Sequence, residues 1–328
     1  MTGASGFVGA NLVRALLARN WSVRALVRGS ATSLDGLEVE RIAGDLFTPL
    51  LRDAMAGCDA VFHVAATYSL WRRDRGEVMR ANVEGTRLVL GAARRAGVPR
   101  VVHTSSVAAI GVRADGEPAG ETYQSAPEDL VGAYKRSKYE AEVAVQRAVA
   151  DGQDVVIVNP TTPVGPWDAK PTPTGEIIVR FCTGRMPAYM DTGLNLVDVR
   201  DVAEGHILAF ERGRTGERYI LGNENMTLRA LLERLAALTG RPAPTVRLPP
   251  LVPLAYAAVG EYLLRPLGFE ADVPFEAVRM ARQRMYYDIA KATSILGFTP
   301  APVTRALSHA VTWFQEHGYF DTPHSREN

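Results

Sequence analysis

Near its start the chain carries the stretch Thr2-Gly3-Ala4-Ser5-Gly6-Phe7-Val8-Gly9, which decides the fold. Its three glycines are spaced three residues apart, and the helical pattern Val8–Arg19 follows at once. Glycines at this spacing let the backbone turn tightly and approach a pyrophosphate, which then sits on the N–H groups of the following helix. The stretch therefore predicts a turn that binds the phosphates of a dinucleotide, formed by Gly3, Gly6, Phe7, Val8 and Gly9.

Short β-branched runs alternate with longer helical patterns after this turn. The expected strands are Trp21–Val27, Glu38–Ile42, Ala60–Val64, Arg100–Thr104 and Asp154–Val158, and the expected helices are Val8–Arg19, Glu77–Ala96 and Ala133–Ala150. Such alternation indicates a parallel sheet with helices on both faces. The sequence thus predicts an α/β protein, with a doubly wound parallel Rossmann sheet that binds NAD(P) in residues 1–165.

The first strand of this sheet is truncated at the N-terminus. In a doubly wound sheet the glycine turn follows a central strand, yet only Met1 precedes Thr2. A shortened central strand leaves backbone groups of its neighbours unpaired, which is costly. We therefore expect weakened pairing between two neighbouring strands, and a native chain that begins a few residues earlier.

The amino-acid composition of the chain changes after Asn159-Pro160, where a stretch rich in Pro, Gly and Thr begins. We expect residues 166–328 to form a smaller C-terminal α/β substrate region, mostly helical, with residues 195–215 returning to the Rossmann domain. A stripe of leucines predicts an amphipathic helix packed in its core: Leu228, Leu231, Leu232, Leu235 and Leu238. The apolar stretch Leu251–Leu264 is expected as a lid or core helix rather than a membrane-surface helix, because its own sequence has no basic face.

Charge and composition argue against several classes of function. Lys and Arg total 37 against 36 Asp and Glu, so the chain lacks the basic excess typical of nucleic-acid binding. Two cysteines and six scattered histidines predict neither a disulfide framework nor a metal site. We find no apolar stretch of membrane-spanning length and no basic, apolar leader. We expect a cytoplasmic protein that acts on a small molecule, as a monomer or a homodimer, without stable membrane insertion.

Three residues with complementary chemistry follow in the order that a catalytic group requires. Tyr134 and Lys138 are four residues apart at the start of an expected helix, so they share one face. A nearby ammonium lowers the pKa of a phenol from about 10 toward neutrality, which suits a general acid or base. Ser105 and Ser106 follow the strand Arg100–Thr104, at the edge where parallel sheets bind ligands. We predict that Ser106, Tyr134 and Lys138 are catalytic.

Taken together, these features resemble the extended short-chain dehydrogenase/reductase family, also called the NAD-dependent epimerase/dehydratase family, over essentially the whole chain. The resemblance rests on Thr2–Gly9, Gly44-Asp45-Leu46, His63-Val64-Ala65-Ala66, Asn82-Val83-Glu84-Gly85-Thr86, Thr104-Ser105-Ser106, Tyr134–Lys138 and Pro160–Pro166. Residues 170–175, 186–196 and 216–222 are similar to the dihydroflavonol-reductase-like branch and, within it, to the hopanoid-associated sugar epimerases.

This resemblance implies a role for each matching residue. Tyr134 would be the general acid/base, Lys138 would lower its pKa and hold the nicotinamide ribose, and Ser106 would bind the substrate oxygen. Asn82 would brace the backbone of the site. The other implied cofactor contacts are Asp45 and Leu46 at the adenine, Ala65 and Ala66 on the adenosine side, and Thr104, Pro160 and Thr162.

The choice of cofactor depends on the residues after the strand Trp21–Val27. An acidic residue at this position selects NAD, but here Arg28, Gly29 and Ser30 follow the strand. A guanidinium suits a ribose 2′-phosphate. We therefore predict NADP, with NAD as the alternative, and this preference favours reduction because epimerases of the family usually recycle a tightly held NAD.

The substrate region departs from the pattern of the nucleotide-sugar members of the family. Those members usually carry an arginine shortly before a His-Val-x-Asp segment; here Leu194 takes the arginine position and Asp198 the histidine position. A diphosphate without a fixed guanidinium is poorly held, which favours a bulky, largely apolar carbonyl compound. The candidate pocket residues are Tyr68, Leu70, Trp71, Met186, Tyr189 and Leu194.

Three hypotheses remain open from the sequence. The leading one is an NADP-dependent oxidoreductase that acts on a carbonyl or alcohol carbon, linked to hopanoid or isoprenoid metabolism. The alternative is a sugar epimerase or dehydratase that uses bound NAD(P). A third is a dinucleotide-sensing regulator without turnover, although such sensors typically lose the Tyr or the Lys, and Tyr134 and Lys138 are both present here.

Overall fold

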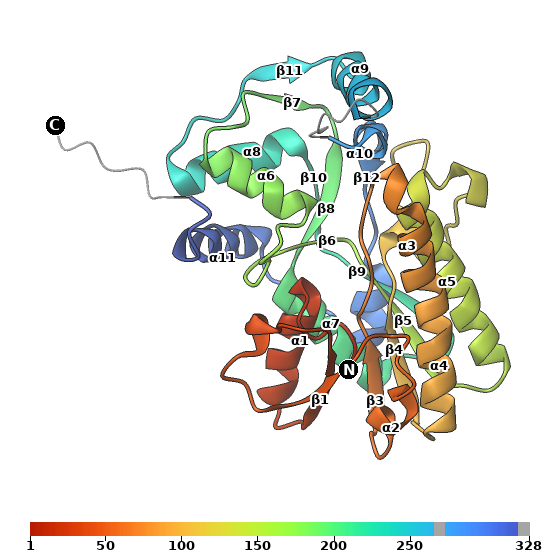
Figure 1. Cartoon of the computed structure of the whole chain (residues 1–328). Coiled ribbons are helices and arrows are strands. Elements are labelled where there is room, and N and C mark those ends of the chain that lie inside the picture. Colours follow the sequence, from red (N-terminus) through yellow and green to blue (C-terminus); the bar gives the residue numbers. More distant parts are fainter. Residues whose placement is uncertain (266–272, 321–328) are drawn as a thin grey trace.

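The computed structural model describes residues 1–265 and 273–320 of the chain. Its N-terminal part is a parallel sheet with helices on both faces (Figure 1). The strands pair in the order β3 (Ala60–His63), β4 (Arg100–Thr104), β5 (Val155–Pro160) and β9 (Arg218–Leu221), all parallel. Every residue of β5 is buried, as expected for a strand covered on both faces. The predicted α/β Rossmann architecture is confirmed.

The weakened pairing at the first strand is also confirmed. β1 (Val23–Val27) and β2 (Val39–Ala43) form a separate parallel pair beside the main sheet. Thr2 joins the two parts through parallel bridges to Leu26 and His63. The Thr2 N–H donates to the Phe62 carbonyl at 3.0 Å, and the Met1 carbonyl accepts from the Leu26 N–H at 2.9 Å. Met1 and Thr2 therefore occupy the position of the central strand.

Two groups of helices cover the two faces of the sheet. α1 (Phe7–Leu17) packs against α7 (Val199–Arg212) on one face. α2 (Leu51–Met55), α4 (Gly85–Arg95) and α5 (Gly132–Ala150) cover the other face (Figure 1). The buried side chains of each group form an apolar core with the strands, so the sheet is held between two layers of helices.

The predicted bounds of the strands and helices agree with the structure to within a few residues. The helical stretch predicted over Glu77–Ala96 is helical as far as Arg95, but it includes a π turn that the sequence pattern does not predict. The segment contains α3 (Arg75–Met79), a turn of π-helix η3 (Arg80–Glu84) and α4. A π turn carries an extra residue and occurs frequently at functional sites, and apolar periodicity cannot reveal it. Here the π turn carries Asn82, which is buried.

The second half of the chain builds a mixed layer beside the Rossmann sheet. β8 (Gly193–Asp198) pairs with β6 (Thr162–Val164), β10 (Glu224–Thr227) and β12 (Arg284–Met285), and β10 runs antiparallel to it. α6 (Pro173–Cys182), α8 (Leu228–Thr239) and α11 (Val303–Glu316) share one apolar core with β8. β7 (Ala188–Met190) and β11 (Val246–Leu248) form a parallel pair at the top of Figure 1.

The predicted leucine stripe of α8 is confirmed for four of its five residues, whereas the core part of the lid-or-core prediction for Leu251–Leu264 is wrong. Leu228, Leu231, Leu232 and Leu235 are buried in α8, and Leu238 near its end is exposed. α9 (Leu251–Ala258) and the π-helical segment η6 (Val259–Leu264) form one continuous helix of which only Ala257 and Gly260 are buried. No helix among residues 1–265 and 273–320 is long and apolar enough to cross a membrane.

The remaining short elements are connectors between these layers. They are η1 (Thr32–Leu34), η2 (Arg72–Asp74), η4 (Val107–Ala109), η5 (Pro127–Asp129), α10 (Phe275–Met280) and η8 (Ala292–Leu296).

Candidate active site

The glycine-rich turn lies at the amino end of α1. Gly3 has a φ of 70°, a left-handed conformation that glycine adopts without strain. A Cβ on Gly3 would lie 2.5 Å from the Ala65 amide nitrogen, and a Cβ on Gly9 would collide with the Gly3 carbonyl. Both positions therefore require glycine, because any side chain would push the turn apart.

This turn fits the pyrophosphate of a dinucleotide. The N–H groups in the first turn of an α-helix lack partners within the helix and attract an anion. In α1 that first turn contains no acidic side chain, and Phe7 and Val8 are only partly buried there. Gly3, Gly6, Phe7, Val8 and Gly9 are accordingly the residues that would hold the phosphates.

Arg28 follows β1 directly and is exposed. Among the described residues its side chain has no hydrogen bond or ion pair. The Ser33 hydroxyl donates to the Ser5 carbonyl at 2.9 Å and thereby ties the loop after β1 to the glycine turn. The Arg28 guanidinium is thus not engaged by any other group of the described chain.

Asp45 and Leu46 follow β2 within a short turn. The Asp45 Oδ1 atom accepts the Phe47 N–H at 2.8 Å, and the Asp45 side chain is exposed. Leu46 packs against α4, where a Cβ on Gly85 would lie 2.7 Å from it. Both residues border the side of the sheet that includes β1 and β2.

Ala65, Ala66, Pro160 and Thr162 lie at or just beyond the carboxyl ends of β3 and β5, the two strands that flank β4. Ala65 and Ala66 come after β3, and the Ala65 N–H donates to the Thr2 hydroxyl at 3.3 Å. Pro160 is the last residue of β5 and is buried, while Thr162 begins β6 and is partly buried. Their carboxyl-edge positions are those that the resemblance assigns to cofactor contacts.

Ser106 caps η4 immediately after β4. Its hydroxyl oxygen accepts the Ala108 N–H at 3.1 Å, and its carbonyl accepts the Asn159 side-chain N–H at 3.0 Å. The neighbouring Ser105 is buried, and its hydroxyl has no hydrogen-bond partner within the described chain. The geometry therefore favours Ser106 over Ser105 as the serine of the site.

Tyr134 lies in the first turn of α5, where its phenol interacts with the side chain of Ser106. Burial raises the pKa of Tyr134 above its usual value, and the interaction with Ser106 acts in the opposite direction. The ring of Tyr68 packs edge to face on the ring of Tyr134, with centroids 4.5 Å apart. Burial, and not Lys138, thus sets the direction of the Tyr134 pKa, contrary to the lowering that the sequence predicts, and Tyr134 keeps its proton at neutral pH.

Lys138 lies one turn further along α5 and is buried. Its Nζ atom donates to the Thr104 carbonyl at 2.9 Å. Burial lowers the pKa of Lys138 to about 8, and the Glu142 carboxylate acts in the opposite direction. The Thr104 hydroxyl itself bonds to His206 Nε2 at 2.8 Å, so only its carbonyl faces the lysine.

Asn82, in the π turn, connects two backbone segments beside Tyr134. Its Nδ2 atom donates to the Thr67 carbonyl at 2.9 Å and to the Ser137 hydroxyl at 2.8 Å. Its Oδ1 atom accepts the Thr67 N–H at 2.8 Å. The Ser137 hydroxyl in turn donates to the Tyr134 carbonyl at 2.8 Å. Asn82 thus links the loop after β3 to the turn of α5 that carries Tyr134.

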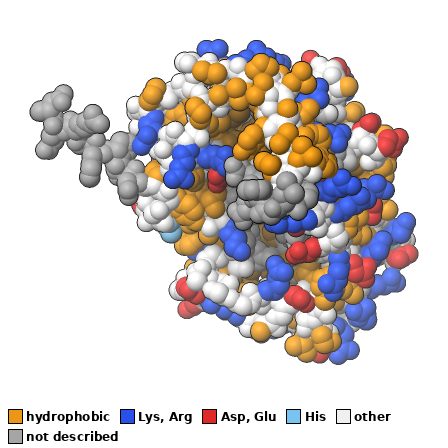
Figure 2. Space-filling model, turned by 45° about the horizontal axis from the view of Figure 1, so that its top comes forward, with side chains coloured by type: hydrophobic (Ala, Val, Ile, Leu, Met, Phe, Trp, Pro, Cys, Tyr) orange, Lys and Arg blue, Asp and Glu red, His pale blue; other side chains and the backbone are white. Residues whose placement is uncertain are grey.

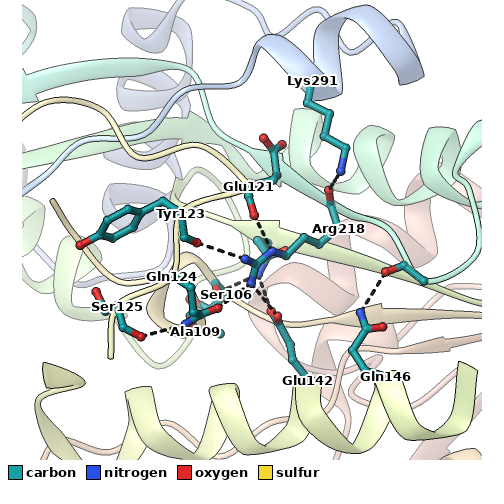
Figure 3. A network of polar contacts seen from close by, with 12 residues as sticks. Ser106, Ala109, Glu121, Tyr123, Gln124, Ser125, Glu142, Gln146, Arg218 and Lys291 are labelled. Carbon is teal, nitrogen blue, oxygen red and sulfur yellow. Dashed lines mark hydrogen bonds and ion pairs between the residues drawn. The ribbon is translucent and has the colours of Figure 1, made fainter. Parts of the chain in front are cut away.

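A polar network connects Ser106 with Glu142 and Arg218 (Figure 3). Asn159, near the end of β5, donates to the Ser106 carbonyl at 3.0 Å and to Glu142 Oε1 at 2.6 Å. Glu142 Oε2 pairs with Arg218 at 3.2 Å, and the two side chains are 8% and 19% exposed. Arg218 also donates to the carbonyls of Glu121 and Tyr123 and to Gln124 Oε1. The network ties the backbone of Ser106 to the face of α5 that carries Lys138.

This network was not predicted from the sequence. Glu142 follows Lys138 by four residues, and this spacing could have predicted that the two side chains share one face of α5. Asn159 and Arg218 come from separate strands, β5 and β9, and no local pattern marks either as a partner of α5.

Two buried histidines close to the site are structural. His63 bonds to the hydroxyls of Thr2 at 2.8 Å and Thr86 at 3.0 Å, and His206 bonds to that of Thr104. Burial lowers the pKa of His63 to about 3 and that of His206 to about 4, so both are neutral near pH 7. Within the part of the chain that the structure describes, no three potential metal ligands cluster together.

The candidate substrate residues fall into two sets. Tyr68 is 45% exposed and touches Tyr134, and Trp71 lies beneath the Arg265 guanidinium at 4.5 Å. Met186 and Leu194 are partly buried against the core of α6, α8 and α11. Leu70 and Tyr189 are buried, so they belong to the core rather than to a pocket.

Asp198 is the N-cap residue of α7. It is fully buried and accepts the Arg200 N–H and the Arg200 Nε–H, both at 2.9 Å. The position at which nucleotide-sugar members carry histidine is therefore used here to begin a helix.

Comparison with known proteins identifies the family. Residues 1–222 match the NAD dependent epimerase/dehydratase family. The chain is 54% identical to a Synechocystis protein named "Putative dihydroflavonol 4-reductase", over 98% of this chain and 96% of that protein. It is 39% identical to "Sterol demethylase protein B" of Methylococcus capsulatus, over 97% of this chain and 98% of the relative.

Two further similarities bear on the chemistry. A Stigmatella aurantiaca protein named as a ketoreductase of a farnesyl-dihydroquinoline oxide is 38% identical, over 86% of this chain and 84% of its own. The solved structure of a nucleoside-diphosphate-sugar epimerase from Pseudomonas aeruginosa superposes with a TM-score of 0.80, at 28% identity and covering 98% of both chains. The chain belongs to the NAD-dependent epimerase/dehydratase family, the extended short-chain dehydrogenases/reductases, and is an NAD(P)-dependent oxidoreductase or epimerase.

Proposed function

We propose that this enzyme is an NADP-dependent oxidoreductase that transfers hydride to or from a carbonyl or alcohol carbon, with Tyr134 as the general acid/base. The observation that carries the proposal is the meeting of three groups at the end of β4. The Ser106 side chain interacts with the Tyr134 phenol, and the Lys138 ammonium donates to the Thr104 carbonyl at 2.9 Å. A hydroxyl, a protonated phenol and a cation at one strand end are what proton transfer to a carbonyl oxygen requires.

A bound nicotinamide cofactor supplies the hydride in this chemistry. The residues of the chain handle the proton. In reduction, the Ser106 hydroxyl orients the carbonyl oxygen, and Tyr134 donates its proton to that oxygen as it becomes an alkoxide. The Lys138 ammonium favours the phenolate that remains on Tyr134. In oxidation, the Tyr134 phenolate takes the proton of the alcohol.

The preference for NADP rests on Arg28. A 2′-phosphate would offer this guanidinium a charge-assisted hydrogen bond, and no carboxylate stands at positions 28–30 to accept the ribose hydroxyls of NAD. Gly3, Gly6 and Gly9 would hold the pyrophosphate, and Lys138 would also contact the nicotinamide ribose.

We infer a bulky, largely apolar substrate without a nucleotide diphosphate. Leu194 offers no charge to a diphosphate, and Asp198 is committed to capping α7. The ring of Tyr68 packs against that of Tyr134 and is 45% exposed. It would therefore form an aromatic wall of the substrate pocket beside the proposed proton donor. The names of two relatives contain a sterol and a farnesyl group, which supports a hopanoid or isoprenoid compound.

A sugar epimerase is the second candidate, and the 28% identity to a nucleoside-diphosphate-sugar epimerase favours it. In that reaction the same Tyr134 would move the proton at a sugar carbon, and the cofactor would be NAD regenerated in each cycle. The cofactor preference and the substrate class therefore separate the two candidates.

The test combines cofactor titration with a substrate screen. The purified protein is titrated with NADP and with NAD by calorimetry, and is then mixed with NADPH and a panel of triterpenoid and farnesylated ketones. We expect tighter binding of NADP and loss of nicotinamide absorbance with at least one apolar ketone. Tighter binding of NAD, together with interconversion of UDP-sugars and no ketone turnover, would establish the epimerase instead.

A further inference from the structure

The continuous helix α9–η6 presents an exposed apolar face. The large side chains on it are between 42% and 72% exposed: Leu251, Val252, Tyr256, Val259, Tyr262, Leu263 and Leu264. Val252, Tyr256, Val259 and Leu263 recur at helical spacing and so form one stripe. Figure 2 shows hydrophobic side chains gathered at this end of the molecule, with Lys and Arg side chains along their margin. We call these seven residues the apolar face.

Three segments, residues 71–75, 261–265 and 275–284, bring arginines to the margin of the apolar face. Residues 71–75 and 261–284 contain seven arginines and five carboxylates, of which Asp74, Glu261 and Glu276 belong to the described residues. Glu261 holds the segments together, because its carboxylate accepts the Arg72 N–H at 3.4 Å and the Phe275 N–H at 2.8 Å. The rings of Tyr262 and Phe275 also pack edge to face at 5.6 Å. We call the arginines the collar: Arg72, Arg73, Arg75, Arg265, Arg279, Arg282 and Arg284.

The collar keeps a net positive charge. Of the three described carboxylates, Asp74 is bonded to Ser69 and Arg73, and Glu261 to two backbone N–H groups. The third, Glu276, interacts electrostatically with Arg279 and Arg75. Arg72, Arg75, Arg279, Arg282 and Arg284 are exposed, and none has an ion pair among the residues that the structure describes. The basic face that is missing from the sequence of Leu251–Leu264 is therefore supplied by other segments.

We propose that the apolar face and its collar dock on a membrane surface that contains anionic lipids. Helices of this kind lie in the plane of the interface, with aliphatic side chains at the acyl boundary and cations on lipid phosphates. Tyrosines such as Tyr256 and Tyr262 suit the headgroup level, where one end of the ring is apolar and the other wet.

The charge of the collar favours an anionic membrane over a second copy of the chain as the partner of the apolar face. A symmetric dimer built on the apolar face would bring two copies of the same patch together, and so two collars of like charge. A surface of lipid phosphates complements the same collar. The charge pattern thus favours the anionic membrane.

The docking surface adjoins the candidate site. The Glu276 carboxylate lies against Gly132, the first residue of α5, where a Cβ would collide with it. Arg265 covers Trp71, three residues beyond Tyr68. If the function proposed above holds, an apolar substrate dissolved in the membrane would reach Tyr134 from this side; the docking itself does not depend on that function.

Vesicle flotation with the full chain tests the proposal. The probes are phosphatidylcholine vesicles with and without phosphatidylglycerol, at low and high salt. We expect binding to the anionic vesicles that weakens with salt. Neutralising two collar residues, Arg72→Gln with Arg279→Gln, should weaken it about 25-fold, since each basic residue near such a surface contributes about 1 kcal/mol. Leu263→Asp should weaken it at least tenfold.

Matched controls lie on other elements. Arg94→Gln with Arg147→Gln removes two exposed arginines from α4 and α5, and Leu50→Asp alters a leucine that is 50% exposed beside α2. Both should bind vesicles like the unmodified protein, and circular dichroism checks that every variant folds. Absence of vesicle binding, or equal losses in the control and collar variants, would overturn the proposal. Dimerisation that Leu263→Asp abolishes, without vesicle binding, would assign the face to a second copy. Turnover of a water-soluble ketone without vesicles reports on the proposed function separately.

Discussion

Replacing Glu142 by Gln should move the alkaline limit of activity to lower pH. The Glu142 carboxylate raises the pKa of Lys138, against the larger effect of burial, and the balance leaves that pKa at about 8. Gln keeps the size of the side chain and an oxygen for Asn159, but it removes the negative charge. The pKa of Lys138 must therefore fall below about 8, and the lysine loses its proton at a pH where the unmodified enzyme still carries it.

The structure also indicates how much the Glu142→Gln substitution lowers the stability of the protein. Glu142→Gln breaks the largely buried pair with Arg218, but Arg218 keeps the Glu121 and Tyr123 carbonyls and Gln124 as acceptors. We expect a loss of about 1–3 kcal/mol in the free energy of unfolding, as for one weakened hydrogen bond to a charged group. For a chain of this length that corresponds to a melting temperature lower by about 1.5–4 °C.

The assay is the pH dependence of kcat/KM for the cofactor, which reports on groups of the free enzyme. The control is Glu140→Gln, which removes a carboxylate of the same helix from an exposed pair with Arg136. That variant should keep the pH profile and change stability by no more than about 1 kcal/mol. An alkaline limb that stays in place in a folded Glu142→Gln enzyme would refute the coupling between Glu142 and Lys138.

Two further predictions concern the cofactor. Arg28→Asp should weaken NADP binding by about 10- to 150-fold, the range for a hydrogen bond to a charged group, and should weaken NAD binding much less. Calorimetry that finds NAD bound more tightly than NADP by the unmodified protein would contradict the role of Arg28. Gly9→Ala should abolish most of the dinucleotide affinity, because the new Cβ collides with the Gly3 carbonyl. The control variant Gly76→Ala, whose Cβ meets nothing within 4 Å, should bind the dinucleotide normally. Equal affinities in the two variants would argue against the glycine turn as the phosphate site.

Much of the fold could be predicted because local patterns specify it. The glycine spacing, the runs of β-branched residues and the leucine stripe of α8 each follow from a short window of sequence. The weak pairing around Thr2 could be predicted as well, since the place of a glycine turn in a Rossmann sheet requires a strand before it. The π turn at Asn82 could not, because its apolar spacing resembles that of an ordinary helix.

The parts of the site that escaped prediction depend on contacts between distant segments. Arg218 reaches Glu142 from the last strand of the sheet, and no property of either segment alone reveals that pairing. The collar is a similar case, because its arginines surround Leu251–Leu264 only after three segments come together on Glu261. Asp198 shows the reverse: its departure from the family pattern was visible in sequence, but its role as a helix cap required the structure.

The identity of the proton donor is the central claim, and stopped-flow hydride transfer in Tyr134→Phe tests it most directly. This variant preserves the ring that packs on Tyr68 and removes only the hydroxyl. NADPH affinity, measured separately, should stay within about twofold, and the rate of hydride transfer should fall by about two to four orders of magnitude, the range that general acid catalysis supplies. Undiminished hydride transfer in a folded, cofactor-binding Tyr134→Phe enzyme would contradict the account, because the proton would then come from another group.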